Sequence, residues 1–495
     1  MVRILLMFFL ILFLTLPAFT QSLDTAWVRR FNGQANDYDA ANAIVVDDSG
    51  NVYTTGRSYG IGTNYDCVTI KYYPNGDTAW VRRYNGPSCD WEEAYAIAID
   101  GYGNVFVTGV SWGNATYWDY LTIKYYPNGD TAWVRKYNGP GNLQDKALAI
   151  TVDGYGNAYV TGASMGDTTG YDYATIKYHS NGDTAWLRRY NGPDYSEDDA
   201  FAIAVDDSNN VYVSGTTGTI KYNAEGEELW VRSWGGVALA LDGSDNVCVT
   251  GGQDDYITIK YYPNGDTAWV RRYNGTGNPY YYDYATAIAI DGFNNIYVTG
   301  YSWGDHTSHD YATVKYYTNG DTAWVRRYNG PGNYWDVALA MVADDSGNVY
   351  VTGYSSQNWI WPNANYDYAT IKYDSYGNEI GVRRYNGPGN LDDKSYSITT
   401  DNYGNVYVTG CSYGIIGLGD YATIKYINFF MRGDTNGDKQ RDVSDIVYLI
   451  NYLFRYGPAS NPSGSGDANC DGKVSISDVV YLINYLLKGG SPPPC

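Results

Sequence analysis

The sequence contains few of the residues that carry histidine-based and thiol-based chemistry. Only three histidines occur among 495 residues, and the six cysteines lie far apart without a Cys-x-x-Cys spacing. This distribution matches no recognisable disulfide framework or zinc site, and it removes most histidine-dependent catalysis. Lysine and arginine number 33 against 54 acidic residues, which gives a net charge of −21. Because phosphate binding needs clustered basic side chains, a nucleic-acid partner is excluded.

Long apolar runs are also scarce. The only one extends from Ile4 to Leu16, directly after Arg3. A basic start, a short apolar run and small residues after it predict a signal peptide over residues 1–20. A membrane anchor is the alternative, but the run is shorter than the roughly 20 residues that a spanning helix needs. We therefore expect no membrane span, and a protein that is secreted and either extracellular or associated with the cell surface.

Internal repeats dominate the remaining sequence. The segment 77–86, Asp-Thr-Ala-Trp-Val-Arg-Arg-Tyr-Asn-Gly, recurs along the chain, and three further apolar segments resembling 95–100, 104–109 and 120–125 recur with it. Each segment alternates in period two or is rich in β-branched and aromatic residues, which favours strands. Turns such as 74–77, Pro-Asn-Gly-Asp, supply the hairpin residues between them. Four antiparallel strands in each of eight units predict one propeller blade per unit, over residues 24–430.

The phase of the repeat indicates a closed ring. The repeats begin with a fourth-type strand at 26–31 and end with a third-type strand at 421–426. Pairing 26–31 against 422–426 would complete the last blade and remove two exposed edges. We therefore predict an all-β, eight-bladed β-propeller; a seven-bladed ring with one degenerate unit is the alternative.

The repeat also resembles a known family. Gly-Asn-Val-Tyr-Val-Thr-Gly at 347–353 and Tyr-Asp-Tyr-Ala-Thr-Ile-Lys-Tyr at 366–373 are similar to the bacterial β-propeller repeats called SBBP repeats. The resemblance covers nearly all of residues 24–426. It implies the fold and leaves the function open, because propellers have many activities.

Two 12-residue acidic loops follow the repeats. Oxygen-bearing residues occupy loop positions 1, 3, 5, 9 and 12, with position 7 offering its carbonyl, which is the spacing of an EF-hand calcium loop. Position 12 is Asp rather than Glu. Two bound calcium ions are predicted, with ligands Asp434, Asn436, Asp438, Gln440, Asp442 and Asp445 in the first loop, and Asp467, Asn469, Asp471, Lys473, Ser475 and Asp478 in the second.

Each loop leads into an apolar helix, at 446–454 and 479–487. The duplicated loop and helix resemble a type I dockerin over residues 433–488, with a Pro-rich tail at 489–495. The resemblance implies a small α-helical module that docks, with calcium, onto a cohesin domain of a scaffold or surface protein. It places the recognition residues at Val443, Ser444, Ile476 and Ser477. A calcium-stabilised cap without a partner is the alternative.

The loops on one rim of the predicted ring vary between units, and variable loops are where binding sites concentrate. We predict ligand-binding residues among their aromatic side chains, namely Trp112, Trp118, Trp303, Trp335, Trp359 and Trp361. Such rings suit stacking on sugars, and they equally suit packing against neighbouring loops. Units four and five almost lack these loops, which predicts an open-sided cleft. His306 and His309 share one loop and are expected at the surface.

Two recurring residue types have structural explanations. The tryptophan at one position of the fourth strand is expected to pack between blades. A carboxylate precedes the third strand in seven units, at Asp66, Asp119, Asp172, Asp255, Asp310, Asp367 and Asp420. We favour capping of the loop, or pairing with a basic residue of the blade, over a ring of carboxylates for cation binding or acid–base chemistry.

Three functions fit these features. The first is a non-catalytic binding subunit whose propeller holds a polysaccharide or a surface protein. The second is a polysaccharide-degrading enzyme, either a glycoside hydrolase or a lyase, carried by a dockerin; no unique pair of carboxylates identifies itself. The third is a structural protein of the cell surface. Variation in aromatic rather than polar residues favours the binding subunit.

Overall fold

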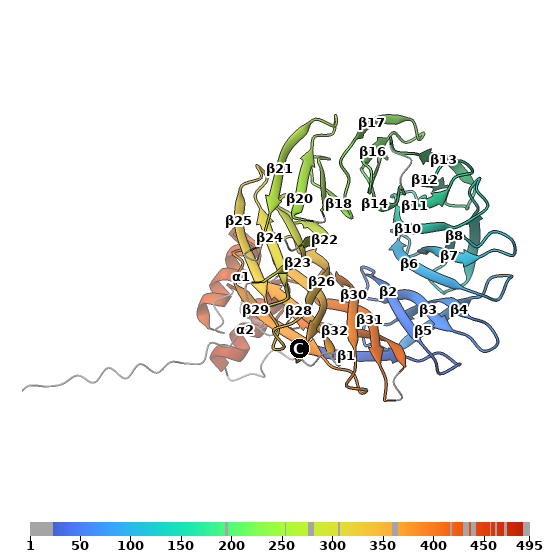
Figure 1. Cartoon of the computed structure of the whole chain (residues 1–495). Helices are drawn as coiled ribbons and strands as arrows, with labels where there is room; N and C mark the ends of the chain where they lie inside the picture. The colour runs from blue at the N-terminus through green and yellow to red at the C-terminus, as the bar shows by residue number, and fades with distance from the viewer. Residues whose placement is uncertain are drawn as a thin grey trace, which may run out of the picture.

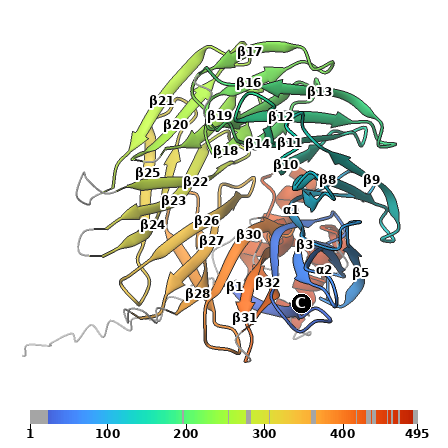
Figure 2. The ribbon, with the colours of Figure 1, turned by 45° about the vertical axis from the view of Figure 1, so that its right-hand side comes forward.

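The computed structural model describes residues 23–193, 197–252, 254–275, 282–304, 307–358, 365–415, 418–428, 435–436, 442–455, 457–460, 463–469 and 473–488. In these residues the strands form eight four-stranded antiparallel sheets, the blades of a ring (Figures 1 and 2). The second and third strands of the blades are buried at nearly every position, because each blade packs between two neighbours. The all-β, eight-bladed prediction is confirmed, and the seven-bladed alternative is wrong.

The first four blades run in chain order from the inner to the outer strand. Blade 1 contains β2 (Asp39–Val46), β3 (Val52–Tyr59), β4 (Tyr65–Tyr72) and β5 (Thr78–Tyr84). Blade 2 contains β6 (Glu92–Ile99), β7 (Val105–Trp112), β8 (Trp118–Tyr125) and β9 (Thr131–Tyr137). Blade 3 contains β10 (Asp145–Val152), β11 (Ala158–Met165), β12 (Tyr171–Tyr178) and β13 (Thr184–Tyr190). Blade 4 contains β14 (Ala200–Val205), β15 (Val211–Gly215), β16 (Thr219–Tyr222) and β17 (Glu228–Arg232).

The next three blades follow the same order. Blade 5 contains β18 (Ala238–Leu241), β19 (Val247–Gly251), β20 (Tyr256–Tyr261) and β21 (Thr267–Tyr273). Blade 6 contains β22 (Asp283–Ile290), β23 (Ile296–Trp303), β24 (His309–Tyr316) and β25 (Thr322–Tyr328). Blade 7 contains β26 (Asp336–Ala343), β27 (Val349–Ser356), β28 (Tyr366–Tyr373) and β29 (Glu379–Tyr385).

Blade 8 closes the ring with strands from both ends of the repeat region. Its order is β30 (Asp393–Thr400), β31 (Val406–Tyr413), β32 (Gly419–Asn428) and then β1 (Leu23–Phe31). The register pairs Phe31 with Tyr421 and Thr25 with Tyr426. The predicted pairing of the first strand against the last is confirmed, and it leaves β32 with a partner on each side.

One contact recurs at the seams between blades. The fourth-strand tryptophan donates its Nε1–H to a carbonyl in the turn between the third and fourth strands of the next blade, at 3.1–3.3 Å. The seven donors are Trp27, Trp80, Trp133, Trp186, Trp230, Trp269 and Trp324, all of them buried. The packing role expected for the repeated tryptophan is confirmed.

The eighth blade-to-blade seam lacks this contact for a topological reason. In β29 the tryptophan position is Gly381, which lies opposite Lys372. The next blade has no turn between its third and fourth strands, because β32 and β1 come from opposite ends of the repeats. A tryptophan at position 381 would therefore have no turn carbonyl to bind.

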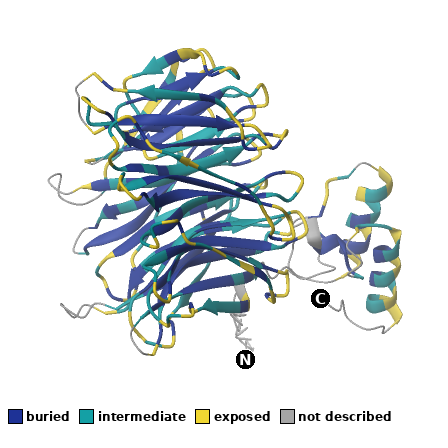
Figure 3. Cartoon of the chain, turned by 90° about the vertical axis from the view of Figure 1, so that its right-hand side faces the viewer, coloured by how far each residue is buried: buried dark blue, intermediate teal, exposed yellow. Residues whose placement is uncertain are grey.

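The C-terminal region forms two helices, α1 (Val443–Arg455) and α2 (Ile476–Lys488), with a short 3-10 helix, η1 (Ser463–Gly466), between them. Leu449 and Leu482 are fully buried at equivalent positions and pack together with Ile446 and Val479. Figure 3 shows the buried strands of the ring, and the exposed faces of both helices. Among the described residues, none of the helices is both long enough and apolar enough to span a bilayer.

Candidate functional site

The carboxylates at the starts of the third strands, which are the second residue of the strand in every case but Asp255, are used in ion pairs. Five of them contact the fourth-strand arginine of their own blade at 2.6–3.1 Å: Asp66–Arg83, Asp172–Arg189, Asp310–Arg327, Asp367–Arg384 and Asp420–Arg30. A sixth pair, Asp255–Arg272, is longer at 3.7 Å. In blade 2 the carboxylate is Asp119, and the basic residue near it is a lysine rather than an arginine. Burial raises the pKa of Asp119. The predicted pairing is thus confirmed for the five close pairs, each of which joins a carboxylate to a guanidinium.

The first group of rim aromatics lies on blade 2. Trp112 and Trp118 face each other across β7 and β8 with their ring centroids 5.8 Å apart. Trp118 also lies 6.3 Å from Trp91, and the Nζ of Lys146 lies 5.2 Å from the Trp118 ring. Both predicted residues are half-buried. Much of their surface therefore packs against neighbouring side chains, and the remainder faces solvent.

The second group lies on blades 6 and 7 around His309. The rings of Trp303 and Trp335 each lie 4.9 Å from its imidazole, and Tyr301 lies at 5.2 Å. His309 is only 8% exposed, so its predicted surface position is wrong; the surrounding rings exclude water, and burial lowers its pKa. Trp335 is 39% exposed and offers a ring face to solvent. Trp359, Trp361 and His306 lie outside the described residues.

A polar cluster on blades 1 and 2 was missed by the sequence analysis. Arg57 Nη1 lies 2.8 and 2.9 Å from the two carboxylate oxygens of Glu93, which is 3% exposed. The guanidinium lies over the rings of Tyr38 and Tyr65, each at 5.2 Å, and of Trp91 at 5.6 Å. Such cation–π contacts strengthen when water is excluded. The cluster therefore combines a buried ion pair with three aromatic rings on the variable rim.

The signal for this cluster was present in the repeats. Aligned on the strand register, the position of Arg57 is occupied in other blades by uncharged residues, namely Val110, Ala163, Tyr301, Tyr354 and Cys411. Arg57 therefore places a charge at a strand position where these five other blades have an uncharged residue. Glu93 comes from the adjoining blade, so only the folded ring brings the two charges together.

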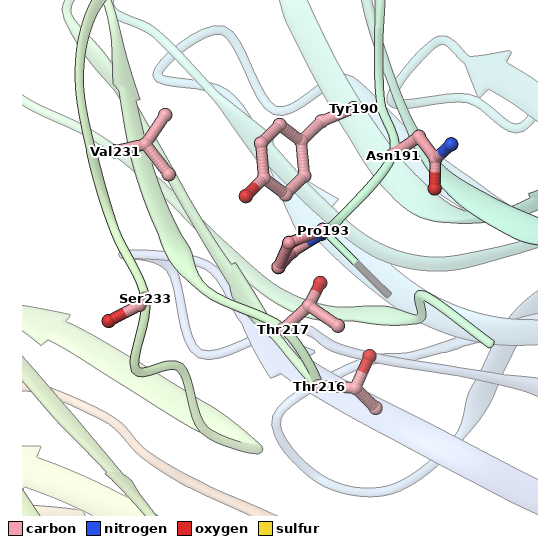
Figure 4. A pocket seen from close by; sticks show the side chains of 7 residues that line it. All are labelled: Tyr190, Asn191, Pro193, Thr216, Thr217, Val231 and Ser233. Carbon is pink, nitrogen blue, oxygen red and sulfur yellow. The ribbon is translucent and has the colours of Figure 1, made fainter. Parts of the chain in front are cut away.

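A pocket of about 700 Å³ opens between blades 3 and 4, where the connecting loop of blade 4 is short (Figure 4). Tyr190, Asn191, Pro193, Thr216, Thr217, Val231 and Ser233 line it. In Figure 4 the Tyr190 hydroxyl points into the space between Val231 and Pro193. The pocket lies in the region where short loops predicted a cleft, and none of its lining side chains is charged.

The two acidic loops adopt matching conformations in their described parts. Asp445 and Asp478, at loop position 12, are both fully buried. Asp445 accepts backbone N–H bonds from Asn436 at 3.2 Å and Asp442 at 2.9 Å. Asp478 accepts corresponding bonds from Asn469 at 3.1 Å and Ser475 at 2.8 Å. Two buried carboxylates, each beside a loop of oxygen-bearing residues, fit the needs of a hard divalent cation.

The remaining predicted ligands divide into two sets. The described loop residues include Asn436, Asp442, Asp467, Asn469, Lys473 and Ser475. Asp434, Asp438, Gln440 and Asp471 lie outside the described residues. The ligand assignment therefore stays a prediction.

The residues expected to recognise a partner occupy equivalent places at the starts of the two helices. Val443 is 52% exposed and Ile476 is 61% exposed. The hydroxyl of Ser444 accepts a bond from the Asn436 side chain at 2.7 Å, and that of Ser477 accepts one from Asn469 at 2.9 Å. Each serine thus connects the start of a helix to a residue of its own loop.

Comparisons with known proteins agree with this architecture. The model of the Beta-propeller repeat family, SBBP, matches residues 26–63, 79–114, 268–306 and 380–417. The model of the Dockerin type I domain matches residues 432–489. No protein with a curated description matches the sequence.

Solved structures resemble the chain only weakly. The polysaccharide lyase Uly1 is 12% identical with a TM-score of 0.41, over 78% of this chain and 89% of that one. XC5397 from Xanthomonas campestris, described as a gluconolactonase, is 11% identical with a TM-score of 0.30, over 57% of this chain and 96% of that one. A Bacteroides caccae protein of unknown function is 12% identical with a TM-score of 0.32, over 53% of this chain and 90% of that one. These likenesses are too weak to bear on activity. The repeat and domain matches, together with the eight-bladed ring and the paired loops and helices, identify the chain as an SBBP β-propeller repeat protein with a C-terminal type I dockerin domain.

Proposed function

We propose that this chain is an exported, non-catalytic binding subunit. Its dockerin, residues 433–488, docks with calcium onto the cohesin of a scaffold or surface protein. Its propeller, residues 24–430, holds a polysaccharide or a surface protein. Residues 1–20 act as the export signal and are removed; they lie outside the described residues.

The observation that carries the docking role is the near-identity of the two helix faces. Val447 and Val480 are each 52% exposed, Phe454 is 61% exposed and Leu487 is 62% exposed. Apolar side chains exposed in this way are favourable only when a partner covers them. Because each helix presents the same set next to its own calcium loop, either helix can present the docking surface.

Two features support binding over catalysis in the propeller. Acid–base cleavage of a glycosidic bond needs two carboxyl groups that flank the bond. The five closest rim carboxylates are held by arginines, and Glu93 is held by Arg57. The rim instead offers the partly exposed rings of Trp112, Trp118 and Trp335. Such rings have an apolar face and a polar edge and suit contact with sugars.

The test uses the mature full-length chain. Affinity electrophoresis through gels containing plant or bacterial polysaccharides measures binding, and an assay for new reducing ends measures cleavage. Retardation without new reducing ends is the expected result. A Trp335→Ala variant should migrate faster than the wild type in the retarding gel, while a Trp133→Phe variant, altered inside a blade seam, should not.

Docking is tested separately with a panel of immobilised cohesins. We expect retention of the chain on at least one cohesin with calcium and release with a chelator. New reducing ends would contradict the binding role of the propeller, and retention that ignores calcium would contradict the docking mechanism.

A further inference from the structure

Four blades contain the same polar quartet at the rim end of their fourth strand. In blade 3, Arg189 donates to the Tyr137 hydroxyl of blade 2 at 3.0 Å, to the Ser164 hydroxyl and carbonyl, and to Asp172 at 2.6 Å. Arg327 in blade 6, Arg384 in blade 7 and Arg30 in blade 8 make the same set of contacts. In these four seams the tyrosine, the serine and the aspartate are thus arranged around a guanidinium.

Blade 4 lacks that guanidinium. The arginine of the quartet stands three residues after the fourth-strand tryptophan, as Arg189 does after Trp186, and three residues after Trp230 the chain has Ser233. The loop between β15 and β16 is shortened as well, so the quartet carboxylate is also missing there. The serine position of the quartet is occupied by Thr217.

Two acceptor positions of the quartet remain around the gap, the Tyr190 phenol and the carbonyl of Thr217, and a buried carboxylate lies next to them. The Tyr190 hydroxyl, which corresponds to that of Tyr137, makes no hydrogen bond to another residue in the described part of the chain, and it faces the pocket in Figure 4. Asp198, which corresponds to Asp145, is fully buried and holds the Gly192 N–H with one oxygen, while its Oδ1 has no partner. A phenol and a carbonyl are therefore the two acceptors left where an arginine is missing. The free Oδ1 of Asp198 is not specific to this seam, because Asp39 and Asp336 have one in blades that keep their arginine.

A second groove lies at a seam that keeps its arginine. Between blades 8 and 1 it is lined by Phe31, Asn32, Gln34, Val81 and Arg83, and its volume is about 430 Å³. Between blades 3 and 4, where Ser233 stands at the arginine position, the volume is about 700 Å³. The groove without the arginine is the larger of the two.

We propose that the pocket between blades 3 and 4 binds a guanidinium group from outside the chain, either on an arginine side chain of another protein or on a small guanidine compound. The incoming group takes the place of the missing arginine. It donates to the Tyr190 hydroxyl and to the Thr217 carbonyl, as Arg189 donates to Tyr137 and Ser164. This site does not depend on the dockerin or on the polysaccharide role of the aromatic rim.

The local charge favours a cation. After desolvation, the charges that raise the pKa of Tyr190 are those of Asp198 and Glu228. Hydrogen bonds between a charged donor and protein acceptors contribute about 1.5–3 kcal/mol each, so the loss of one bond weakens binding by roughly tenfold or more. Because the quartet carboxylate is absent, we expect a single guanidinium group to bind weakly. Weak binding at one site suits a multivalent contact.

The test is a titration of the full-length chain with methylguanidinium, followed by saturation-transfer NMR and calorimetry. We expect about one site per chain in the wild type, retained in Ser233→Ala. Ser233→Arg should fill the pocket, weaken binding by at least about tenfold and raise Tm, because it restores the quartet bonds. Equal binding by the wild type and Ser233→Arg would overturn the proposal.

Two further variants keep the test decisive if Ser233→Arg does not fold. Tyr190→Phe removes one acceptor and should weaken binding about tenfold; unchanged binding would overturn the proposal. Arg189→Ser opens a second copy of the pocket and should raise the number of sites from one to two. A short arginine peptide that binds more tightly than agmatine indicates a protein partner, and the reverse order indicates a small guanidine compound.

Discussion

The indole N–H of Trp27 donates to the carbonyl oxygen of Pro74 at 3.1 Å, and this bond joins the first strand of the repeats to blade 1. The same bond joins Trp133 to Ser180, at 3.2 Å, between blades 2 and 3. The seam between blade 8 and blade 1, which contains the first strand of the repeats, is therefore built like the seam between blades 2 and 3.

Removing this bond at either place should have the same cost. Trp27→Phe and Trp133→Phe keep a buried ring and lose the hydrogen bond, so each should lower the free energy of unfolding by about 1 kcal/mol. Urea unfolding of the two variants measures this. Gly381→Trp serves as the control and should bring no gain, because blade 8 has no turn to accept the bond; a clear gain would contradict this explanation of the glycine.

Closure itself can be tested in β1. Val28 lies opposite Ile424 in the β1–β32 ladder. Val28→Pro fixes the backbone φ angle near about −65° and so distorts the strand, which exposes the edge of β32. We expect a lower Tm and concentration-dependent aggregation, measured by calorimetry and light scattering. Val28→Thr is the matched control and should remain monodisperse.

The carboxylates on the inner strands should make the folded protein less stable as the pH rises, which is the reverse of the usual effect of a carboxylate. Burial raises the pKa of Asp336 to about 6, with Asp310 adding to the rise and Arg384 opposing it. In the unfolded chain the same group titrates near ~3.9. The folded state thus keeps a proton that the unfolded chain has released, and this contribution to stability falls as the pH rises from about 4 to 6.

An amide at this position removes the titration while keeping an acceptor for the Gly330 N–H. Asp336→Asn should therefore be more stable than the wild type at pH 7.5, by up to about 3 kcal/mol, and should lose most of that advantage by about pH 4. Unfolding in urea across this range measures the difference. A difference that does not change with pH would show that the carboxyl is ionised in both states.

The Arg57–Glu93 pair should behave as a coupled unit. Breaking a buried ion pair by removing one partner costs about 3–5 kcal/mol, because the other charge stays buried without its partner. Arg57→Met and Glu93→Gln should each destabilise strongly, and the double variant should cost less than the sum of the two. A double-mutant cycle by urea unfolding gives the coupling energy; additive effects would show that solvent already screens the pair.

Calcium stoichiometry tests the paired loops. Asp445→Ala and Asp478→Ala each remove a position-12 carboxylate, and each should reduce the number of bound calcium ions from two to one. Calorimetric titration counts the ions. Metal binding and folding of such modules are coupled. Addition of calcium should therefore raise the helical circular dichroism of the wild type and should not raise that of the double variant.

The repeat made the ring predictable, because period, turn residues and phase are all local in sequence. The pairing of 26–31 against 422–426 followed from the phase of the repeat alone. The environments of Arg57 and His309 were not predictable in the same way. Their neighbours come from other strands and blades, such as Glu93 for Arg57 and Trp335 for His309, so only the closed fold brings them together. The pocket beside Ser233 is defined by a side chain that is missing, which stands out only when the blades are superposed in register.

The position of β32 determines how the molecule bears tension. It is the last strand before the dockerin, and it is bonded to β31 on one side and β1 on the other. A force applied through the dockerin enters at the C-terminal end of β32, and its component along the strand acts on both ladders. The hydrogen bonds of both ladders lie across that direction, so they are loaded together in shear rather than opened one after another. The blade that joins the two ends of the repeats is thus also the mechanical anchor of the tether.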